Sequence, residues 1–218
     1  YGIALVALFA PLHESTHGTA FASRAFNRLA AALCGAAVLV PPRWFQHFHF
    51  AHHRYLGDPV NEPELGTAKI ETRRQYLRTL SGTPIHGTLV RTLVRNAAGR
   101  CQDPFVPHSA RRIIAWESRL ILLTHGCLAG ASALTGSWSW CVFWLVPFLA
   151  GQPFLRAFLM AEHHGCPSSD SAARTTLTHP AVRSLSWNMS YHAEHHGAPA
   201  VPFHQLPALH ARLATRPR

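Results

Sequence analysis

Charged side chains are scarce in this sequence, and acidic ones are the scarcest. Charged residues make up 14% of the 218 residues, against about 25% in an ordinary soluble domain. The 10 acidic side chains are outnumbered by 20 basic side chains and by 17 histidines. Disorder requires low hydrophobicity together with high charge, so a chain that is 48% hydrophobic and poor in charge is not disordered. Its length fits one domain.

Cysteine motifs are also missing. The five cysteines, at positions 34, 101, 127, 141 and 166, are odd in number and show no paired spacing, which excludes a disulfide scaffold. The sequence has no ferredoxin-type cysteine run and no haem motif, so redox chemistry would need electrons from a separate protein.

The basic residues gather in one stretch that lacks the marks of a nucleic-acid surface. Residues 69–112 contain nine Lys or Arg and two acids, without the interleaved aromatic residues that stack on bases. Long apolar runs follow, and positive charge beside such runs is typical of a cytoplasmic loop of a membrane protein. We therefore predict a membrane-side loop and no nucleic-acid partner.

Two apolar segments are long enough to cross a bilayer core, which needs about 20 residues. They are residues 113–136 and residues 138–160. Residues 1–12 are apolar but short, and the chain begins with Tyr1 without a signal peptide, so we expect a truncated N-terminus and the end of a partial span. Residues 29–40 are too few to cross, and we predict an interfacial segment there.

Histidines form three clusters with helical spacing. His13 and His17 are four residues apart, whereas the other two clusters repeat the pattern H-x-x-H-H. Positions i, i+3 and i+4 share one face of a helix, so each cluster offers several imidazoles to one point, and imidazole binds zinc, copper, iron or nickel. The two repeated clusters are His49, His52 and His53, and His192, His195 and His196.

The number of predicted crossings places the three clusters together. If residues 29–40 do not cross, the first two clusters stay on one side, and the two later spans return the chain to that side before the third cluster. The clusters and the basic loop then share one face, which the positive charge marks as cytoplasmic.

A different class of enzyme fits the first cluster alone. His13-Glu14-x-x-His17 matches the H-E-x-x-H pattern of zinc proteases, with two histidine ligands and Glu14 as general base. That interpretation leaves both H-x-x-H-H clusters unexplained. A non-catalytic metal-binding membrane protein is a further alternative. One zinc per chain would indicate the protease, and loosely held mixed metals would indicate the metal-binding protein.

The three histidine clusters, called histidine boxes from here on, and the residues beside them resemble those of the membrane fatty acid desaturase–hydroxylase superfamily, in its bacterial desaturase-like branch. The similarity covers nearly the whole chain and is carried by HESTH, PPRWFQHFHFAHHRYLGDPVNEPEL, MAEHHG and WNMSYHAEHHGAPAVPFHQLPALH, in this order. It implies one all-α domain over residues 1–218, an integral membrane helical bundle with a cytosolic helical cap that holds the histidine boxes.

The resemblance also implies nine iron ligands. They are His13, His17, His49, His52, His53, His163, His192, His195 and His196. His163 enters the set because the family has one further histidine between the last span and the third box. The remaining eight are interpreted as non-ligands, with His47 the doubtful one and His86 and His210 expected to be replaceable: His47, His86, His108, His125, His164, His179, His204 and His210.

Polar residues near the boxes are candidates to orient the ligands, since a ligating histidine usually donates its other N–H to a carboxylate or carbonyl. Glu14, Glu162 and Glu194 each adjoin a ligand, and they point about 100° away from it, so each is expected to orient a histidine of another helix. Asp58, Glu62 and Glu64 follow the second box with the same expected role or as partners of the basic loop. Asn188 lies one helical turn before His192, as a metal-site residue or a helix cap.

These expectations together describe an O2-dependent oxidoreductase with two non-haem iron ions. The predicted reaction is desaturation of a fatty-acyl lipid that enters from the membrane through an apolar channel. The alternative within the superfamily is a hydroxylase or ketolase acting on a lipid, alkane or carotenoid. A ferredoxin or cytochrome b5 type donor is expected, with the basic loop as its dock, and the bacterial inner membrane is the expected location.

Overall fold

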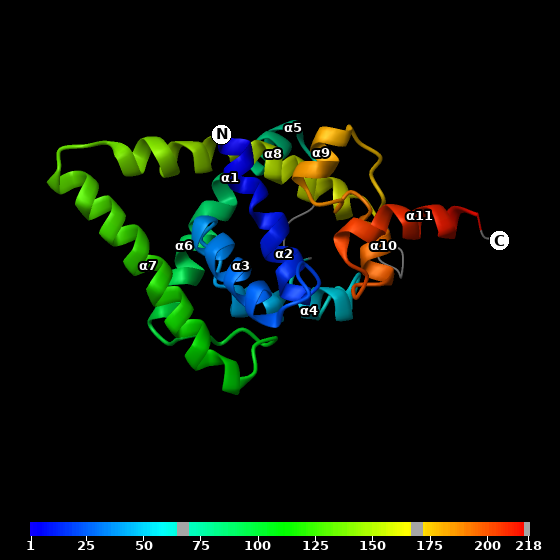
Figure 1. Cartoon of the computed structure of the whole chain (residues 1–218), viewed down its shortest axis with the longest axis horizontal. Helices are drawn as coiled ribbons and strands as arrows, with labels where there is room; N and C mark the ends of the chain where they lie inside the picture. Colours follow the sequence, from blue (N-terminus) through cyan, green and yellow to red (C-terminus); the bar gives the residue numbers. More distant parts are fainter. Residues whose placement is uncertain (65–69, 167–171, 216–218) are drawn as a thin grey trace.

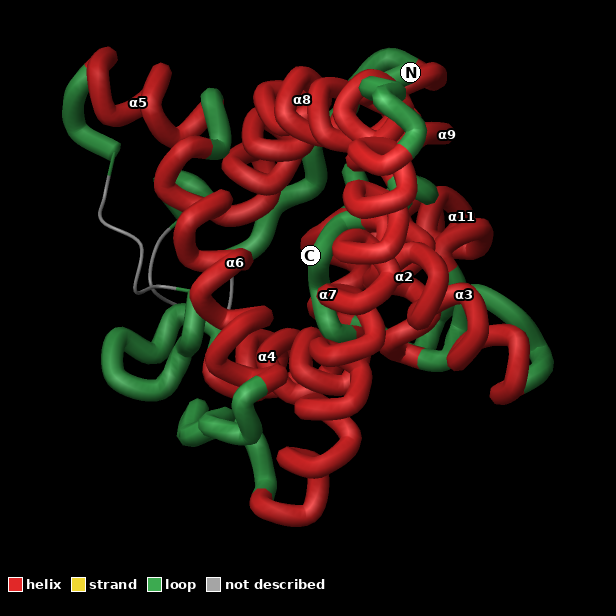
Figure 2. The backbone as a smooth tube through the Cα atoms, turned by 90° about the vertical axis from the view of Figure 1, so that its left-hand side faces the viewer, coloured by secondary structure: helices red, strands yellow, loops and turns green. Residues whose placement is uncertain are grey.

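Helices are the main secondary structure of the part of the chain that the structure describes. The computed structural model describes residues 1–64, 70–166 and 172–215. Figure 2 shows helices joined by loops along these residues, and the all-α prediction is confirmed. The helices are α1 (Gly2–Ala7), α2 (Phe9–His17), α3 (Arg24–Ala37), α4 (Pro42–Tyr55), α5 (Arg73–Leu80), α6 (Thr83–Ala97), α7 (Arg111–Leu134), η2 (Cys141–Leu145), α8 (Val146–His163), α9 (Pro180–Leu185), α10 (His192–Gly197) and α11 (Leu206–Ala214), with short 3-10 turns η1 (His108–Ala110) and η3 (Phe203–Gln205).

The first two helices carry the first histidine box away from an apolar beginning. Leu8, between α1 and α2, keeps right-handed helical angles, so the two helices follow one another with little break. Helix α2 ends after His17 at Gly18, whose φ of 78° is the left-handed conformation that glycine adopts without strain. The box therefore occupies the last turns of a helix whose apolar first part packs in the protein interior.

Helix α1 packs against α8 through two glycines. A Cβ atom added to Gly151 would lie 2.3 Å from the carbonyl oxygen of Gly2, and one added to Gly2 would lie 2.6 Å from the carbonyl oxygen of Pro147. Small residues let helix backbones approach this closely, as in membrane helix pairs. The contact fixes the depth of α1 and α2 along α8, and so the height of the first box relative to His163.

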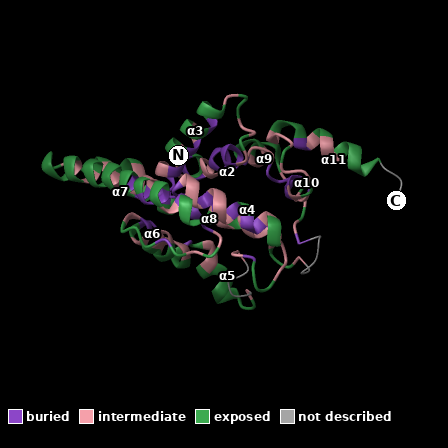
Figure 3. Cartoon of the chain, turned by 90° about the horizontal axis from the view of Figure 1, so that it is seen from below, coloured by how far each residue is buried: buried purple, intermediate pink, exposed green. Residues whose placement is uncertain are grey.

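Helices α7 and α8 form a hairpin that projects from the rest of the molecule (Figure 1). Apolar side chains are exposed along it, and Figure 3 shows its outer part in the colour of exposed residues. Leu134 is 91% exposed, Trp138 75% and Phe143 64%. Soluble monomers rarely expose contiguous apolar surface of this extent, so the hairpin has the surface of an element surrounded by lipid.

The two spans predicted for this region differ in the structure. The described residues contain one helix that by itself is long and apolar enough to cross a membrane, Cys141–His163, near the predicted 138–160. Helix α7 is 24 residues long, close to the predicted 113–136, but its hydropathy stays below that of a span. Glu117 and Arg119 near its beginning are the cause, because each charge lowers the mean hydropathy of the first half.

Those two charges bind neighbouring helix ends. The Glu117 carboxylate accepts a hydrogen bond from the backbone N–H of Arg43, in the first turn of α4, at 2.8 Å. Arg119 donates to the carbonyl oxygen of Ala97 at the end of α6, at 2.7 Å. An acid at a helix N-terminus and a base at a C-terminus both complement the helix dipole. Helix α7 thus holds the helix that carries the second box.

Pro147 leaves a backbone carbonyl group without its helical N–H partner, and a side chain from outside the hairpin binds this group. Proline has no N–H to donate to the carbonyl four residues earlier, which is that of Phe143, and the chain there forms the π-helical turn η2. The hydroxyl of Tyr1 donates to the Phe143 oxygen at 3.0 Å. The Tyr1 side chain therefore satisfies this one carbonyl group of the hairpin.

Helices α3 and α4 meet at a sharp corner. Their axes are bent by 98°, and together the two helices are long and apolar enough to form one broken span or a re-entrant loop. Helix α3 ends at Ala37, and Leu39 in the corner adopts a positive φ of 62°. The prediction that residues 29–40 form an interfacial segment stays a prediction.

Candidate metal centre

All three histidine boxes and His163 converge at one end of the bundle. The first box lies at the end of α2 and the second on the last turns of α4. His163 is the last residue of α8, and the third box forms α10. The nine histidines fall into two groups, and within each group the nitrogens that face a common point lie within 4.8 Å of one another.

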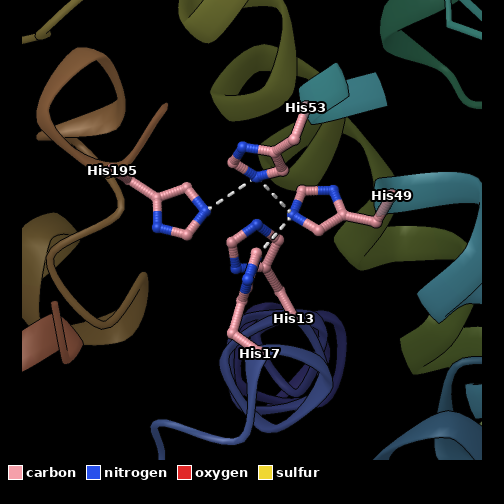
Figure 4. Close-up of side chains that lie close together, drawn as sticks. All are labelled: His13, His17, His49, His53 and His195. Atoms are coloured by element: carbon pink, nitrogen blue, oxygen red, sulfur yellow. Dashed lines mark hydrogen bonds between the residues drawn. The ribbon is translucent and has the colours of Figure 1, made fainter. Parts of the chain in front are cut away.

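The first group contains five histidines, and Figure 4 shows their rings turned toward one another. The Nε2 atom of His49 lies 2.9 Å from that of His17 and 2.9 Å from that of His53. His53 in turn lies 3.1 Å from His195, Nε2 to Nε2. This five-histidine group consists of His13, His17, His49, His53 and His195.

The second group contains four histidines, all turned inward by Nε2. His52 lies 3.2 Å from His163 and 3.2 Å from His196. His192 lies 2.8 Å from His163 and 3.0 Å from His196. This four-histidine group consists of His52, His163, His192 and His196.

Helical geometry explains how the boxes divide. Residues four apart share one helix face, so the pairs 13 and 17, 49 and 53, and 192 and 196 each stay within one group. Neighbouring residues point about 100° apart, so the two adjacent histidines of each H-x-x-H-H box belong to different groups. Each such box therefore spans both positions, and the stacked rings of His53 and His196, with centroids 4.1 Å apart, lie where the groups meet.

The nitrogen spacing fits one cation in each group. Nitrogens bound at about 2.1 Å from one ion lie roughly 3.0–3.4 Å from their neighbours, and the Nε2 separations here run from 2.8 to 3.2 Å. In the five-histidine group, both ring nitrogens of buried His13 lack a hydrogen-bond partner among the described residues. An orphaned imidazole in a buried cluster is satisfied by a metal ion.

Hydrogen bonds in the four-histidine group support the same conclusion. His52 Nδ1 lies 2.6 Å from Glu62 Oε1, and His163 Nδ1 lies 2.8 Å from the carbonyl oxygen of Ala172. A neutral imidazole that donates through Nδ1 has a lone pair on Nε2. In these tautomers two Nε2 lone pairs face each other across 3.2 Å, an arrangement that a cation between them would stabilise.

Burial keeps the third box neutral. Removal from water lowers the pKa of His192, His195 and His196 far below the usual value for histidine, and the neighbouring imidazoles lower it further. These three side chains are therefore unprotonated at neutral pH, the form in which imidazole binds a metal.

Three of the acids predicted to orient ligands contact a candidate ligand histidine that belongs to a different segment of the chain. Glu162 on α8 lies 3.4 Å from His192 Nδ1. Glu62 and Glu64, in the loop after α4, both contact His52 Nδ1, at 2.6 Å and 3.1 Å. All three therefore act on the four-histidine group.

The other polar candidates lie elsewhere. Glu14 accepts a hydrogen bond from the backbone N–H of Phe203, and Asn188 donates to the carbonyl oxygen of the same residue. Glu194 binds Thr175 and His210, whereas partly exposed Asp58 accepts from the backbone of Val60 and Asn61 and closes a turn. These four residues brace the chain around the boxes and contact no ligand histidine through these bonds.

Asn188 corrects a specific expectation. The sequence placed it one turn before His192 on the same helix, but α10 begins at His192. Trp187 and Asn188 both have positive φ, 52° and 59°, so the chain turns there and the helical spacing is broken. Glu14 likewise argues against a zinc protease, because a general base must face the metal-bound water and this carboxylate instead faces Phe203.

Two histidines outside the groups have clear structural partners. His125 on α7 binds the carbonyl oxygen of Ala36 on α3 at 2.9 Å and accepts from the indole of Trp140, as expected for a histidine bonded to a neighbouring helix. His210 on α11 lies 2.6 Å from the carboxylate of Glu194, so the expectation that it is dispensable lacks a structural basis. That link is invisible in the sequence, since it depends on how α11 folds back onto α10.

An apolar pocket reaches the histidines from the bundle. Its walls come from α1, α2, α8 and α9, and its polar lining residues include His13 of the five-histidine group and Glu162, the neighbour of His192. The full lining comprises Ala7, Phe9, Ala10, His13, Phe154, Leu155, Phe158, Leu159, Glu162, Leu185, Ser186 and Met189. An apolar group in this pocket would lie against His13, one of the nine histidines.

Comparison with known proteins agrees with the site. The sequence model described as "Fatty acid desaturase" matches residues 1–217. The chain is 26% identical over 210 residues to dihydrorhizobitoxine desaturase of Bradyrhizobium elkanii, covering 88% of this chain and 59% of that protein. It is 28% identical over 213 residues to a sphingolipid delta(4)-desaturase of Komagataella phaffii, covering 92% and 56%.

A fatty acid desaturase of Bacillus subtilis is 23% identical over 232 residues, covering 94% of this chain and 64% of that protein. The chain thus spans less than two thirds of the length of each of these curated relatives.

Proposed function

The chain belongs to the fatty acid desaturase family, and from this premise we propose that it is a membrane-bound, O2-dependent oxidoreductase that removes two hydrogens from a lipid acyl chain and leaves a C=C bond. The observation that carries the proposal is the convergence of nine histidines into two metal-sized groups. The curated relatives are named as desaturases of different substrates, so the acyl lipid is proposed here as a class.

We assign one iron to each histidine group. His13, His17, His49, His53 and His195 would hold one ion, and His52, His163, His192 and His196 the other. When bound, the iron pair supplies activation of O2 and abstraction of hydrogen from an unactivated C–H bond. The protein's own contribution is a set of imidazole ligands, held by burial and hydrogen bonds, that add no negative charge and would leave the metal centre cationic.

The apolar pocket is the proposed path of the acyl chain. Its walls offer aliphatic and aromatic contact to a hydrocarbon, and its polar end lies at His13 and Glu162. An acyl chain that fills the pocket excludes water from the histidines, which protects a strong oxidant from side reactions. It also holds one part of the chain beside the metal centre, and this positioning decides which bond reacts.

The proposed location is the bacterial inner membrane, with the histidines on the cytoplasmic side. The family is membrane-associated, the helix Cys141–His163 is long and apolar enough to cross, and the hairpin exposes apolar side chains. Because His163 ends that helix, the metal centre would lie at one surface of the bilayer. The basic residues of α5 and α6 would remain outside the lipid on the same side.

Electrons are proposed to come from a ferredoxin or cytochrome b5 type protein. Within the described residues, the arginines of the basic stretch are largely exposed on α5, on α6 and at the beginning of α7. An acidic donor would find complementary charge there. Lys69, part of the same expectation, lies outside the described residues. The exposed arginines are Arg73, Arg74, Arg78, Arg91, Arg100 and Arg112.

Mass spectrometry of host lipids tests the reaction. The gene that encodes this chain would be expressed in a bacterial host, beside the variants His52→Ala and His195→Ala as inactive controls. We expect a new lipid or acyl species lighter by two hydrogens that neither variant produces. A new lipid species that has gained oxygen would instead indicate the hydroxylase or ketolase alternative. The proposal is contradicted if the protein binds two irons and yields no new lipid species. It is also contradicted if the protein binds one zinc per chain.

A further inference from the structure

The two histidine groups differ in what contacts their outward ring nitrogens. In the four-histidine group, His52 Nδ1 meets two carboxylates, Glu62 at 2.6 Å and Glu64 at 3.1 Å, and His192 Nδ1 lies 3.4 Å from Glu162. Over the described ranges, these are the carboxylates in contact with the nine histidines, and all serve this group. The buried Nδ1 atoms of His192 and His195 both lack a hydrogen-bond partner among the same residues, but His192 has the Glu162 carboxylate nearby, and no carboxylate is recorded there against His195 of the five-histidine group.

The loop after α4 is built to hold Glu62 in place. Gly57 has a φ of 78°, which turns the chain back toward α4 at a residue that tolerates this angle. The second oxygen of Glu62 accepts a hydrogen bond from the Gly57 N–H, so one carboxylate binds both the turn and the His52 ring. Its side chain is only 4% exposed, and water therefore screens its charge weakly.

Glu64 adds a second negative charge with a counter-ion from another helix. Its carboxylate contacts the same Nδ1 atom and is more exposed than Glu62. The charge of Glu64 also interacts with the Arg156 guanidinium on α8. Arg156 is held in turn by Gln152 one turn earlier, Nε to Oε1 at 3.2 Å. Two carboxylates and one guanidinium leave net negative charge behind a single imidazole.

A carboxylate on Nδ1 changes what Nε2 does. It fixes the tautomer and the ring plane, and it makes the imidazole a more basic donor to a metal. Outer partners of this kind typically contribute about 10–100-fold in metal affinity. The effect acts through one ligand on one ion, so it cannot be shared equally by two positions.

We propose that the two metal positions are inequivalent, and that Glu62, assisted by Glu64, is a positioning residue that selectively strengthens metal binding at the four-histidine position. Glu62 does not touch the metal. It acts through His52, whereas the five-histidine position binds its ion by ligand number alone. This inference rests on the proposed two-metal function.

Metal titration of single-position proteins tests the assignment. The full chain would be purified in detergent, stripped with a chelator and titrated without oxygen with Fe²⁺, and with Co²⁺ as a spectroscopic probe. His195→Ala should leave the four-histidine position, and His192→Ala the five-histidine position. Glu62→Gln, which keeps the size of the side chain and removes its charge, would be added to each background.

We expect Glu62→Gln to weaken binding about 10–100-fold in the His195→Ala background and less than about twofold in the His192→Ala background. Glu64→Gln should act in the same direction with a smaller loss. Asp58→Asn changes a partly exposed acid in the same loop, whose hydrogen bonds go to Val60 and Asn61, and this matched control should alter binding in neither background. Helix content by circular dichroism verifies folding.

Two results would overturn the inference, and each is distinct from failure of the proposed function. Equal weakening in both backgrounds would mean that Glu62 acts on the whole site, and no weakening in either would mean that it supports only the loop. In both cases a wild-type protein that binds two metal ions and desaturates lipid keeps its proposed function. A wild-type protein that binds no metal pair removes the function and the inference together.

Discussion

The α7–α8 hairpin and the histidine end of the bundle have opposite arrangements of polar and apolar side chains. The hairpin exposes Leu134 and Trp138, whereas the other end buries His195 and Glu14, each with no exposed surface. In a soluble protein both arrangements are costly, since water is kept from polar groups and meets apolar ones. The proposed lipid around the hairpin and the proposed metal ions among the histidines would remove these costs, one in each region.

The largest effect is expected where the polar interior depends on a metal. His195→Ala removes one nitrogen of the five-histidine group, and the similar change His52→Ala removes one of the four-histidine group. We expect each to abolish turnover and to lower the iron content, because an incomplete ligand set holds its ion poorly. Lipid mass spectrometry and iron analysis measure the two outcomes.

Exposed His108 supplies the control, since it lies outside both groups. His108→Ala should retain iron and turnover. Full activity in either His195→Ala or His52→Ala would contradict the two-metal assignment, whatever the hairpin does.

Substitutions of two glycines should show which region sets the position of the site, the α1–α8 contact or the exposed part of the hairpin. Gly151→Leu places a side chain where the Gly2 carbonyl oxygen would lie 2.3 Å from the first added atom, so α1 must move away from α8. This shifts the first box relative to His163 and breaks the joint geometry of the metal groups. We expect a loss of activity of at least about 100-fold, since a displacement of about 1 Å can cost that much.

Gly130→Leu is its counterpart on the exposed part of the hairpin, where an added Cβ meets nothing within 4 Å. It should insert and turn over like the wild type. Equal damage from both substitutions would mean that the hairpin, and not the α1–α8 contact, sets the position of the site.

The surroundings of the hairpin can be tested by charge. Leu123 is 61% exposed in the body of α7, and Leu134 is 91% exposed at its end. Lysine at the centre of a span costs about 2.5–3.5 kcal/mol, whereas near an end it reaches the headgroups. We expect Leu123→Lys to reduce membrane insertion strongly and Leu134→Lys to reduce it little, as measured by alkaline extraction of membranes. Equal insertion would place α7 outside the lipid.

The sequence predicted what depends on local spacing. Positions four apart on one helix share a face in any fold, so the clusters around His13, His49 and His192 could be recognised before the structure. The division into five and four histidines could not, because it depends on how α2, α4, α8 and α10 meet. The Asn188 expectation failed for the same reason: it assumed that a helix continues where the chain turns.

Hydropathy was similarly incomplete for α7. Glu117 and Arg119 reduce the mean hydropathy of α7, yet both side chains bind the ends of neighbouring helices and need not face lipid. A mean hydropathy over a sequence window contains no information on whether a charged side chain is bound by another helix. Conversely, the exposed Leu134 and Trp138 are apolar in any window, but only the structure shows that nothing in the described chain covers them.

The smallest predicted effect concerns the outer edge of the polar region. His210 on α11 binds Glu194, a buried carboxylate on α10 that also accepts from Thr175. His210→Ala leaves one oxygen of this carboxylate without that partner, which costs about 1–3 kcal/mol. We expect a lower melting temperature and a several-fold loss of kcat, because α10 carries three of the histidines, with KM little changed since His210 does not line the apolar pocket.

His210→Gln keeps a side-chain donor and should recover part of both losses. Exposed His204→Ala should change neither, although it stands in the same C-terminal segment. A His210→Ala protein with wild-type melting and kcat would show that the α10–α11 contact does not hold the third box. The polar interior would then be fixed by metal and by the carboxylates behind His52 and His192, without help from the C-terminal helix.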